Sequence, residues 1–132
     1  MTDDDPRYGA EVRRRMAALS GAGSLPEGGD VVTACAGDRE QGAEVRLQFH
    51  VADGRVVDAR FQAFGCPHFL AAASWLTDRL RGAGAAQCEV WDWREAAAAL
   101  EVPAAKYARL LTLQDAVRAA ARNWPGAIRS TV

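Results

Sequence analysis

Long hydrophobic runs and an excess of charge of one sign are both missing from this sequence of 132 residues. No stretch approaches the roughly 18 apolar residues that span a bilayer. The acidic start, residues 1–5, lacks the basic and apolar regions of a secretory signal. Basic residues number 16 and acidic residues 17, whereas a nucleic-acid binder concentrates basic residues on one surface. We therefore expect a cytoplasmic protein that contacts neither membranes nor nucleic acids.

Cysteine and histidine are scarce, with three and two residues. Cys35, Cys66 and Cys88 are an odd number at wide spacing, which does not indicate a disulfide framework. In a reducing compartment such thiols are more often buried, catalytic or metal-binding. Cys88 has no nearby residue of a ligand type on a plausible common face, and we interpret it as structural. The sequence also lacks an acid–base pair, a nucleophile triad and a phosphate-binding glycine loop, so we expect no enzyme activity.

The length and the hydrophobic content of 49% indicate one compact domain. Residues 1–29 are expected to form an N-terminal helix, over 6–19, and then a flexible loop rich in glycine, serine and proline. Residues 30–126 are expected to form a folded α+β unit, and residues 127–132 a C-terminal tail.

The clearest local pattern is the alternation of apolar and polar residues over 45–51, which predicts a half-buried strand. The Asp-Gly pair at 53–54 is a strong hairpin signal. The returning strand is expected to place four apolar residues on one face: Val57, Ala59, Phe61 and Ala63. An earlier short strand starts at residue 31 and ends near Cys35. Together they predict a three-stranded antiparallel sheet with one covered and one more polar face.

Apolar residues at helical spacing predict helices over 66–81 and 103–124, and an alanine-rich segment predicts a shorter helix over 92–100. Because most of these helices follow the strands in the chain, they are expected to pack on one face of the sheet. The predicted fold class is therefore α+β, a three-stranded antiparallel sheet with helices packed on one face.

Two short segments contain residues of the kinds that bind metals. Cys35 and Asp38 follow one strand, and Cys66 and His68 lie between the last strand and a helix. With Pro67 as the first helical residue, Cys66 falls at the helix N-cap, where free amides and the helix dipole favour a thiolate. Thiolate and carboxylate ligands on two separate turns can build a metal or cluster site. The residues alone leave open whether these cysteines bind a metal or are simply buried.

Three stretches carry a resemblance to a known family: Val45-Arg-Leu-Gln-Phe-His-Val, Gly54-Arg-Val-Val-Asp-Ala-Arg-Phe61 and Phe64-Gly-Cys-Pro-His68. They resemble the core of the IscU/NifU-type iron–sulfur cluster assembly scaffolds. The likeness continues through residues 72–77, 100–106 and 111–121, and covers roughly residues 30–124 with strands, cysteine turn and helices in the family's order. The resemblance implies the family's α+β fold and a role in cluster assembly.

The resemblance also places Cys35, Asp38 and Cys66 at ligand positions of the family. The family has a Cys-Gly-Asp motif at a strand end and a second cysteine after the hairpin. In this sequence Ala36 is an extra residue between the first cysteine and Gly37-Asp38.

The family's His-Cys pair in the last helix would fall on Ala108 and Arg109. Both are expected to face the metal pocket, but neither coordinates iron or zinc, since alanine has no donor and arginine stays protonated. Arg109 could occupy the place of the metal by pairing with Asp38. The segment 102–106 also differs from the family's Leu-Pro-Pro-Val-Lys motif for chaperone recognition.

The leading hypothesis is a degenerate scaffold that holds iron, zinc or an iron–sulfur cluster, expected to be [2Fe–2S], through Cys35, Asp38 and Cys66. The site would be completed by His68, an exogenous thiol or a second subunit, and a homodimer would supply four thiolates. By resemblance, the partners are a cysteine desulfurase and other iron–sulfur assembly proteins. Two alternatives stay open: a metal-free module that binds and regulates the assembly machinery, and a thiol-redox protein in which Cys35 and Cys66 form a reversible disulfide.

Overall fold

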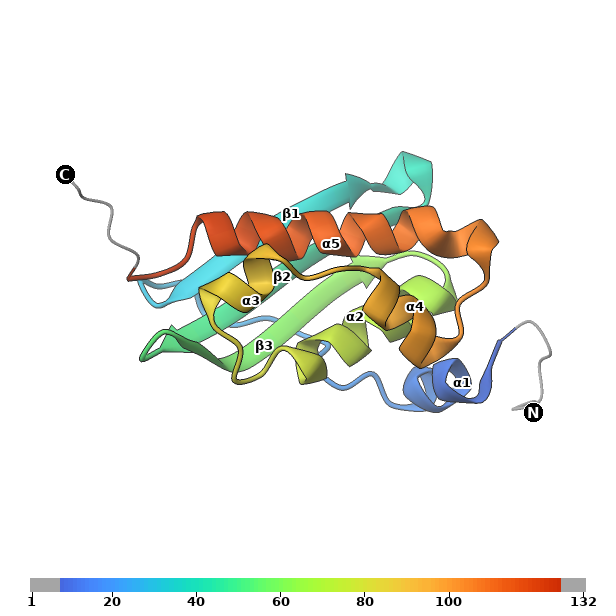
Figure 1. Ribbon diagram of the computed structural model, residues 1–132, viewed down its shortest axis with the longest axis horizontal. Coiled ribbons are helices and arrows are strands. Elements are labelled where there is room, and N and C mark those ends of the chain that lie inside the picture. The colour runs from blue at the N-terminus through green and yellow to red at the C-terminus, as the bar shows by residue number, and fades with distance from the viewer. Residues whose placement is uncertain (1–7, 127–132) are drawn as a thin grey trace.

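The computed structural model describes residues 8–126, a three-stranded sheet with helices (Figure 1). Its elements in chain order are α1 (Ala10–Ala17), β1 (Val31–Asp38), the 3-10 helix η1 (Arg39–Gln41), β2 (Ala43–Ala52), β3 (Arg55–Phe64), α2 (Pro67–Arg79), α3 (Ala85–Glu89), α4 (Arg94–Leu100), the 3-10 helix η2 (Ala104–Lys106) and α5 (Tyr107–Arg122). The predicted α+β class is confirmed. No described helix is long enough and apolar enough to cross a membrane.

The sheet is an antiparallel meander in the order β1-β2-β3, as predicted. The β2–β3 hairpin turns at Asp53 and Gly54, whose φ angles are 53° and 77°. Positive φ at both central residues is what a two-residue type I′ turn requires. Every second residue of β2 from Ala43 to Val51 is buried, so one face of the sheet packs against the helices.

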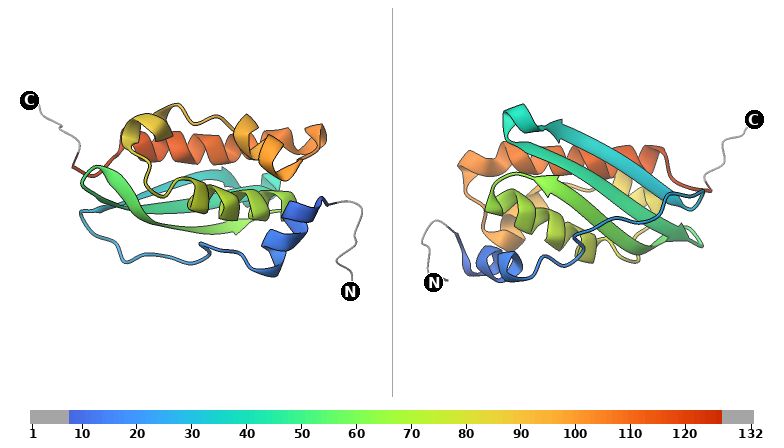
Figure 2. Two further views of the ribbon diagram at one scale, coloured as in Figure 1. Left: turned by 60° about the horizontal axis from the view of Figure 1, so that its bottom comes forward. Right: turned by 180° about the vertical axis from the view of Figure 1, so that it is seen from behind.

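Helices α2 and α5 lie on a single face of the sheet, as predicted, whereas α1 packs against α2 and α4. Helix α5 packs against β1 and β2, and α2 packs against β3 (Figure 2). The largest side chains in this layer are fully buried, among them Phe49, Phe69, Leu76, Leu110 and Leu113. Burial of one such side chain contributes roughly 1.5–3 kcal/mol, so the apolar stabilisation is concentrated in this layer.

The outer face of the sheet, which has no helices, is crossed by the segment between α1 and β1 (Figure 2). The amide of Gly23 donates to the carbonyl of Phe61 at 2.9 Å. Farther along, the buried Gln48 amide accepts from the Leu25 N–H at 2.7 Å and donates to the Leu25 carbonyl at 3.1 Å. Hydrogen bonds to the sheet therefore hold the predicted loop, while Cys35 on the same face stays exposed.

Strand β1 continues to Asp38, so the prediction that it ends near Cys35 is wrong. The continuation depends on Gly37, whose φ is 83°. A Cβ atom at this glycine would lie 2.2 Å from the carbonyl oxygen of Ala43. Only glycine combines this left-handed backbone with so close an approach to β2, and Cys35 consequently lies inside the strand.

A β-bulge changes which residues at the start of β3 face the core. The register with β2 shifts between His50 and Val51, and an extra residue exchanges the two faces of a strand. Val57, predicted to face the core, is 52% exposed, and Val56 is buried instead. Beyond the bulge the predicted inner face holds for Ala59, Phe61 and Ala63.

The remaining helix boundaries differ modestly. Helix α5 begins at Tyr107, after the separate turn η2, and α3 was not predicted. The described part of the first helix starts at Ala10. The start of the predicted helix, before position 8, and the predicted tail at 127–132 lie outside the described residues.

Candidate functional site

Cys35 lies on the outer face of the sheet, away from α5. In β1 the buried residues are Val32 and Ala34, while Cys35 between them and the strand end is exposed. The register pairs Cys35 with Arg46 of β2, and Arg46 with Gln62 of β3. These three side chains form one row across the outer face.

The extra residue Ala36 accounts for this orientation. Successive side chains of a strand point to opposite faces, so one inserted residue moves a side chain to the other face. Ala36 pairs with the buried Val45 and is itself partly buried against the core. If Gly37 followed the cysteine directly, as in the family's motif, the thiol would occupy the inner position that Ala36 holds here.

Asp38 caps the 3-10 helix η1. Its Oδ1 accepts hydrogen bonds from the backbone amides of Glu40 at 2.7 Å and Gln41 at 3.3 Å. The carboxylate thereby satisfies two amide groups of its own turn, which is the usual role of an aspartate before a helical turn.

Arg109 connects α5 to the turn between β1 and β2. Its Nη1 donates to the carbonyl of Gly42 at 2.9 Å and approaches that of Gln41 at 3.5 Å. Gly42 has a φ of 89°, and a Cβ atom there would lie 2.8 Å from Nη1. The predicted pairing of Arg109 with Asp38 is therefore replaced by bonds to backbone carbonyls of the same turn.

Ala108 and Arg109 both line a small hollow of about 210 Å³. Its other lining residues are Gln41, Ala43, Ala105 and Thr112. Both side chains thus face a hollow next to the β1–β2 turn, but neither Cys35 nor Cys66 lines it.

Cys66 and His68 lie at the start of α2. Cys66 is the N-cap, and its carbonyl accepts from the amide of Leu70 at 3.0 Å. The ring of His68 is 4% exposed and lies 4.9 Å from the ring of Tyr8, centroid to centroid. Its Nδ1 has no hydrogen-bond partner among the described residues. Burial, assisted by the positive charge of Lys106, lowers the pKa of His68 and keeps the imidazole neutral.

The predicted ligands do not form one cluster. Within residues 8–126 no three His, Cys, Asp or Glu side chains are grouped so that they could hold a metal ion. Cys35, Cys66 and Cys88 are all free thiols. Cys35 is on β1, whereas Cys66 follows β3, and strands two positions apart are separated by roughly 10 Å. The Cα atoms of a disulfide are 4.4–6.8 Å apart, so the Cys35–Cys66 disulfide of the thiol-redox alternative would require backbone movement.

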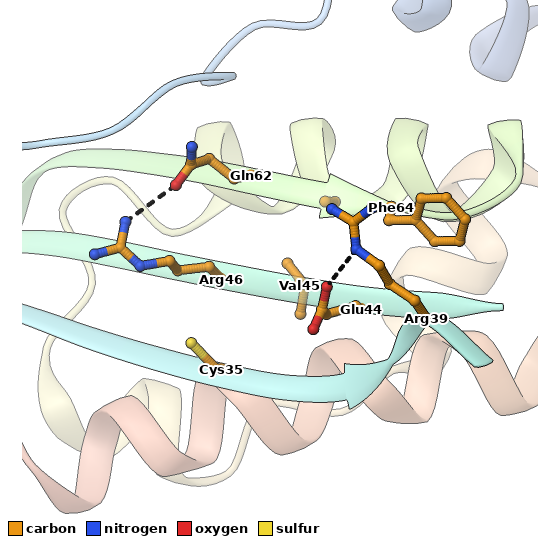
Figure 3. Close-up of a pocket in the computed structure, with 8 residues that line it drawn as sticks. Cys35, Arg39, Glu44, Val45, Arg46, Gln62 and Phe64 are labelled. Carbon is orange, nitrogen blue, oxygen red and sulfur yellow. Dashed lines mark hydrogen bonds and ion pairs between the residues drawn. The ribbon is translucent and has the colours of Figure 1, made fainter. Parts of the chain in front are cut away.

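A hollow of about 330 Å³ opens beside Cys35 on the outer face (Figure 3). We call it the Cys35 hollow, and its lining residues are Cys35, Arg39, Glu44, Val45, Arg46, Gln62, Ala63 and Phe64. The polar members of this set are not among the site residues predicted from the sequence. The polar alternation of the strands marks them as outward-facing, but only the observed register shows which of them surround the thiol.

The protein is therefore of the α+β class, a three-stranded meander covered by helices on one face, with cysteines on β1 and at the start of α2. The chain belongs to the family of NifU-like N-terminal domains, whose family model matches residues 7–131. The iron–sulfur cluster assembly scaffold protein IscU of Azotobacter vinelandii is 30% identical over 96 residues, which are 72% of this chain and 75% of that protein. Iron sulfur cluster assembly protein 1, mitochondrial, of Eremothecium gossypii is 30% identical over 104 residues, 77% of this chain and 68% of that protein.

A solved structure of similar fold is the N-terminal part of a nitrogen-fixing NifU-like protein from Brucella abortus. It superposes with a TM-score of 0.68 at 19% identity, covering 96% of this chain and all of that one. The observed sheet and helices are therefore the fold of this family.

Proposed function

We propose that this chain acts in iron–sulfur cluster assembly as a scaffold-type protein whose metal site is completed from outside the chain. The two relatives above are named as assembly proteins, which supports the process. The separation of Cys35 from Cys66 supports the second part of the proposal, because each region offers one free and at least partly exposed thiol. We expect a cysteine desulfurase to supply the sulfur for the cluster.

Ligand counts explain why a second contributor is needed. A [2Fe–2S] cluster takes four cysteine thiolates, and a structural zinc ion takes four ligands. Asp38 is engaged by backbone amides and the Nδ1 of His68 is buried, so neither joins Cys35 or Cys66 without rearrangement. Two copies of the chain, or one copy with a partner's thiols, would supply the missing ligands.

The second candidate is a metal-free binding module of the assembly machinery. The hydrogen bond from Arg109 to Gly42 favours it, because this bond joins α5 to the β1–β2 turn without an ion. In a complete scaffold, by resemblance, a metal would join the same two elements.

Anaerobic reconstitution with ferrous iron and sulfide separates these candidates. We expect visible cluster absorbance in a fraction that elutes as a dimer, loss of that absorbance in Cys35→Ser and in Cys66→Ser, and retention in Cys88→Ala. Cys88 is a suitable control because it is fully buried. Absence of cluster from the wild-type chain, alone and with a desulfurase, would favour the metal-free module. A monomer that holds a cluster in both serine variants would contradict the proposed site.

A further inference from the structure

The Cys35 hollow contains a thiol flanked by a positive and a negative side chain. Cys35 is directly opposite Arg46, and Glu44 is two residues along β2 on the same face. Figure 3 shows the three side chains on the same side of the sheet, with Cys35 next to Arg46 and Glu44 nearer the turn. The combination is set by the strand register and does not depend on any metal.

The pairing type brings the thiol close to the arginine. Val51 N–H donates to the carbonyl of Asp30 at 2.8 Å, so Asp30 and Val51 are a hydrogen-bonded pair. Because the two kinds of pair alternate along an antiparallel ladder, Cys35 and Arg46 form a non-hydrogen-bonded pair. Side chains are closest in such pairs, with Cα atoms about 4.5 Å apart.

The arginine keeps donors available for a ligand. Arg46 donates to Gln62 Oε1 at 3.0 Å and to Glu27 Oε2 at 3.2 Å. A guanidinium has five N–H donors, and a planar arrangement of two of them matches a carboxylate. The partner Glu27 is strongly exposed, and an exposed ion pair of this kind contributes about 0–1 kcal/mol, so a ligand carboxylate can compete with it.

The opposite side of the hollow offers a carboxylate. Glu44 Oε1 accepts from Arg39 Nε at 3.0 Å, and the Arg39 guanidinium lies 4.8 Å from the centroid of the Phe64 ring. The carboxylate of Glu44 retains further acceptor positions. A ligand that carries a carboxylate, an ammonium group and a sulfur atom on adjacent carbons therefore matches Arg46, Glu44 and Cys35 together. That description is a cysteine residue in its free amino-acid form.

We propose that Cys35 is a thiol–disulfide exchange site selective for cystine, the disulfide of the free amino acid. The Cys35 thiolate attacks one sulfur of cystine and forms a new S–S bond to one cysteine. The cystine S–S bond breaks, and the second cysteine leaves as a thiolate that takes up the proton lost by Cys35. One disulfide is consumed and one is formed, so cystine itself is the oxidant. Cys35 is also a ligand in the proposed cluster assembly, so a chain whose Cys35 carries a cysteine as a mixed disulfide cannot hold a cluster there; the hollow itself depends only on the strand register.

The other two cysteines provide comparisons within the same chain. Cys88 is fully buried, and its burial raises the pKa of the thiol to about 11, so it should not react. Cys66 is partly buried at the N-terminus of α2. Cys66 does not line the Cys35 hollow, so its preference among disulfides should not depend on Arg46.

The test compares four small disulfides on the reduced protein: cystine, dithiodipropionate without the ammonium groups, cystamine without the carboxylates, and uncharged bis(2-hydroxyethyl) disulfide. Each rate at each cysteine is measured by peptide mass spectrometry and divided by the rate of 2-mercaptoethanol with the same disulfide. One charge pair at about 4 Å in water changes a rate about fivefold. We expect cystine to react at Cys35 about fivefold faster than dithiodipropionate and cystamine, which each carry charges of only one sign, and we expect this preference to shrink in high salt.

Three variants assign the preference to its residues. Arg46→Gln should lower the cystine rate at Cys35 to that of cystamine, and Arg46→Lys should retain part of it. Glu44→Gln should lower the cystine rate to that of dithiodipropionate. The four-disulfide comparison on the wild-type protein needs no variant to fold. Equal normalised rates for cystine and the uncharged disulfide at Cys35, or a cystine preference unchanged in both glutamine variants, would overturn the proposal.

Discussion

Replacing Arg109 with alanine removes the link between α5 and the β1–β2 turn. The Nη1 atom donates to the Gly42 carbonyl at 2.9 Å, and a hydrogen bond from a charged donor contributes about 1.5–3 kcal/mol. Because the side chain is only half-buried, we expect the lower end, about 1.5 kcal/mol. For a chain of this length 1 kcal/mol shifts Tm by roughly 4 °C, so Arg109→Ala should lower Tm by about 6 °C.

Thermal and urea unfolding, followed by circular dichroism, measure this loss. The matched control is Arg122→Ala, an exposed position on the same helix, which carries the same change in helix propensity. Its Tm should change by less than about 2 °C. Arg109→Lys keeps the charge without the planar fork and should recover only part of the stability.

A double-mutant cycle with Asp38→Asn tests the geometry behind this magnitude. Asparagine preserves the capping acceptor of Asp38 and removes its charge. Since the carboxylate bonds to the amides of Glu40 and Gln41, the coupling with Arg109 should stay below about 0.5 kcal/mol. A coupling above about 1 kcal/mol, or loss of the Arg109 effect in high salt, would show an ion pair with Asp38 and refute the reasoning.

Three further predictions concern the sheet and the start of α2. Deleting Ala36 in an Ala108→His, Arg109→Cys background should raise zinc affinity well above that of the two substitutions alone, as measured by competition with a coloured chelator. An unchanged affinity would show that the outward orientation of Cys35, caused by the extra residue, is not what prevents zinc binding. Gly37→Ala should lower Tm by more than about 8 °C, because its φ of 83° and its contact 2.2 Å from the Ala43 carbonyl both oppose a Cβ; an unchanged Tm would contradict this. His68 has a lowered pKa in the folded state, so its stabilisation is complete above the unfolded pKa of about 6.5 and is lost as pH falls through the folded value. Tm should therefore fall on acidification towards pH 5, and a His68→Phe variant that keeps the full pH dependence would exclude this origin.

Local patterns in the sequence were sufficient for the three strands, for α2, α4 and α5, and for their order. The alternation over 45–51 and the Asp53-Gly54 turn predicted the central hairpin, and both are present. Pro67 predicted the start of α2, which begins there. These features depend on residues close together in the chain, where side-chain period and turn geometry act directly. The motifs of the resemblance likewise led to the family that the comparisons show.

Only the tertiary structure decided on which face of the sheet Cys35 lies. The Cys35 thiol faces outward because β1 continues past it and Ala36 adds one residue before Gly37. The bulge after His50 then determines that Arg46 is paired with Gln62. Without the bulge, Arg46 would be paired with the residue before Gln62 in β3, whose side chain now lies on the inner face of the sheet. A change of one residue in pairing reverses the face of every side chain beyond it. The register is determined by all the contacts between neighbouring strands together, so it cannot be predicted from the local pattern along one strand.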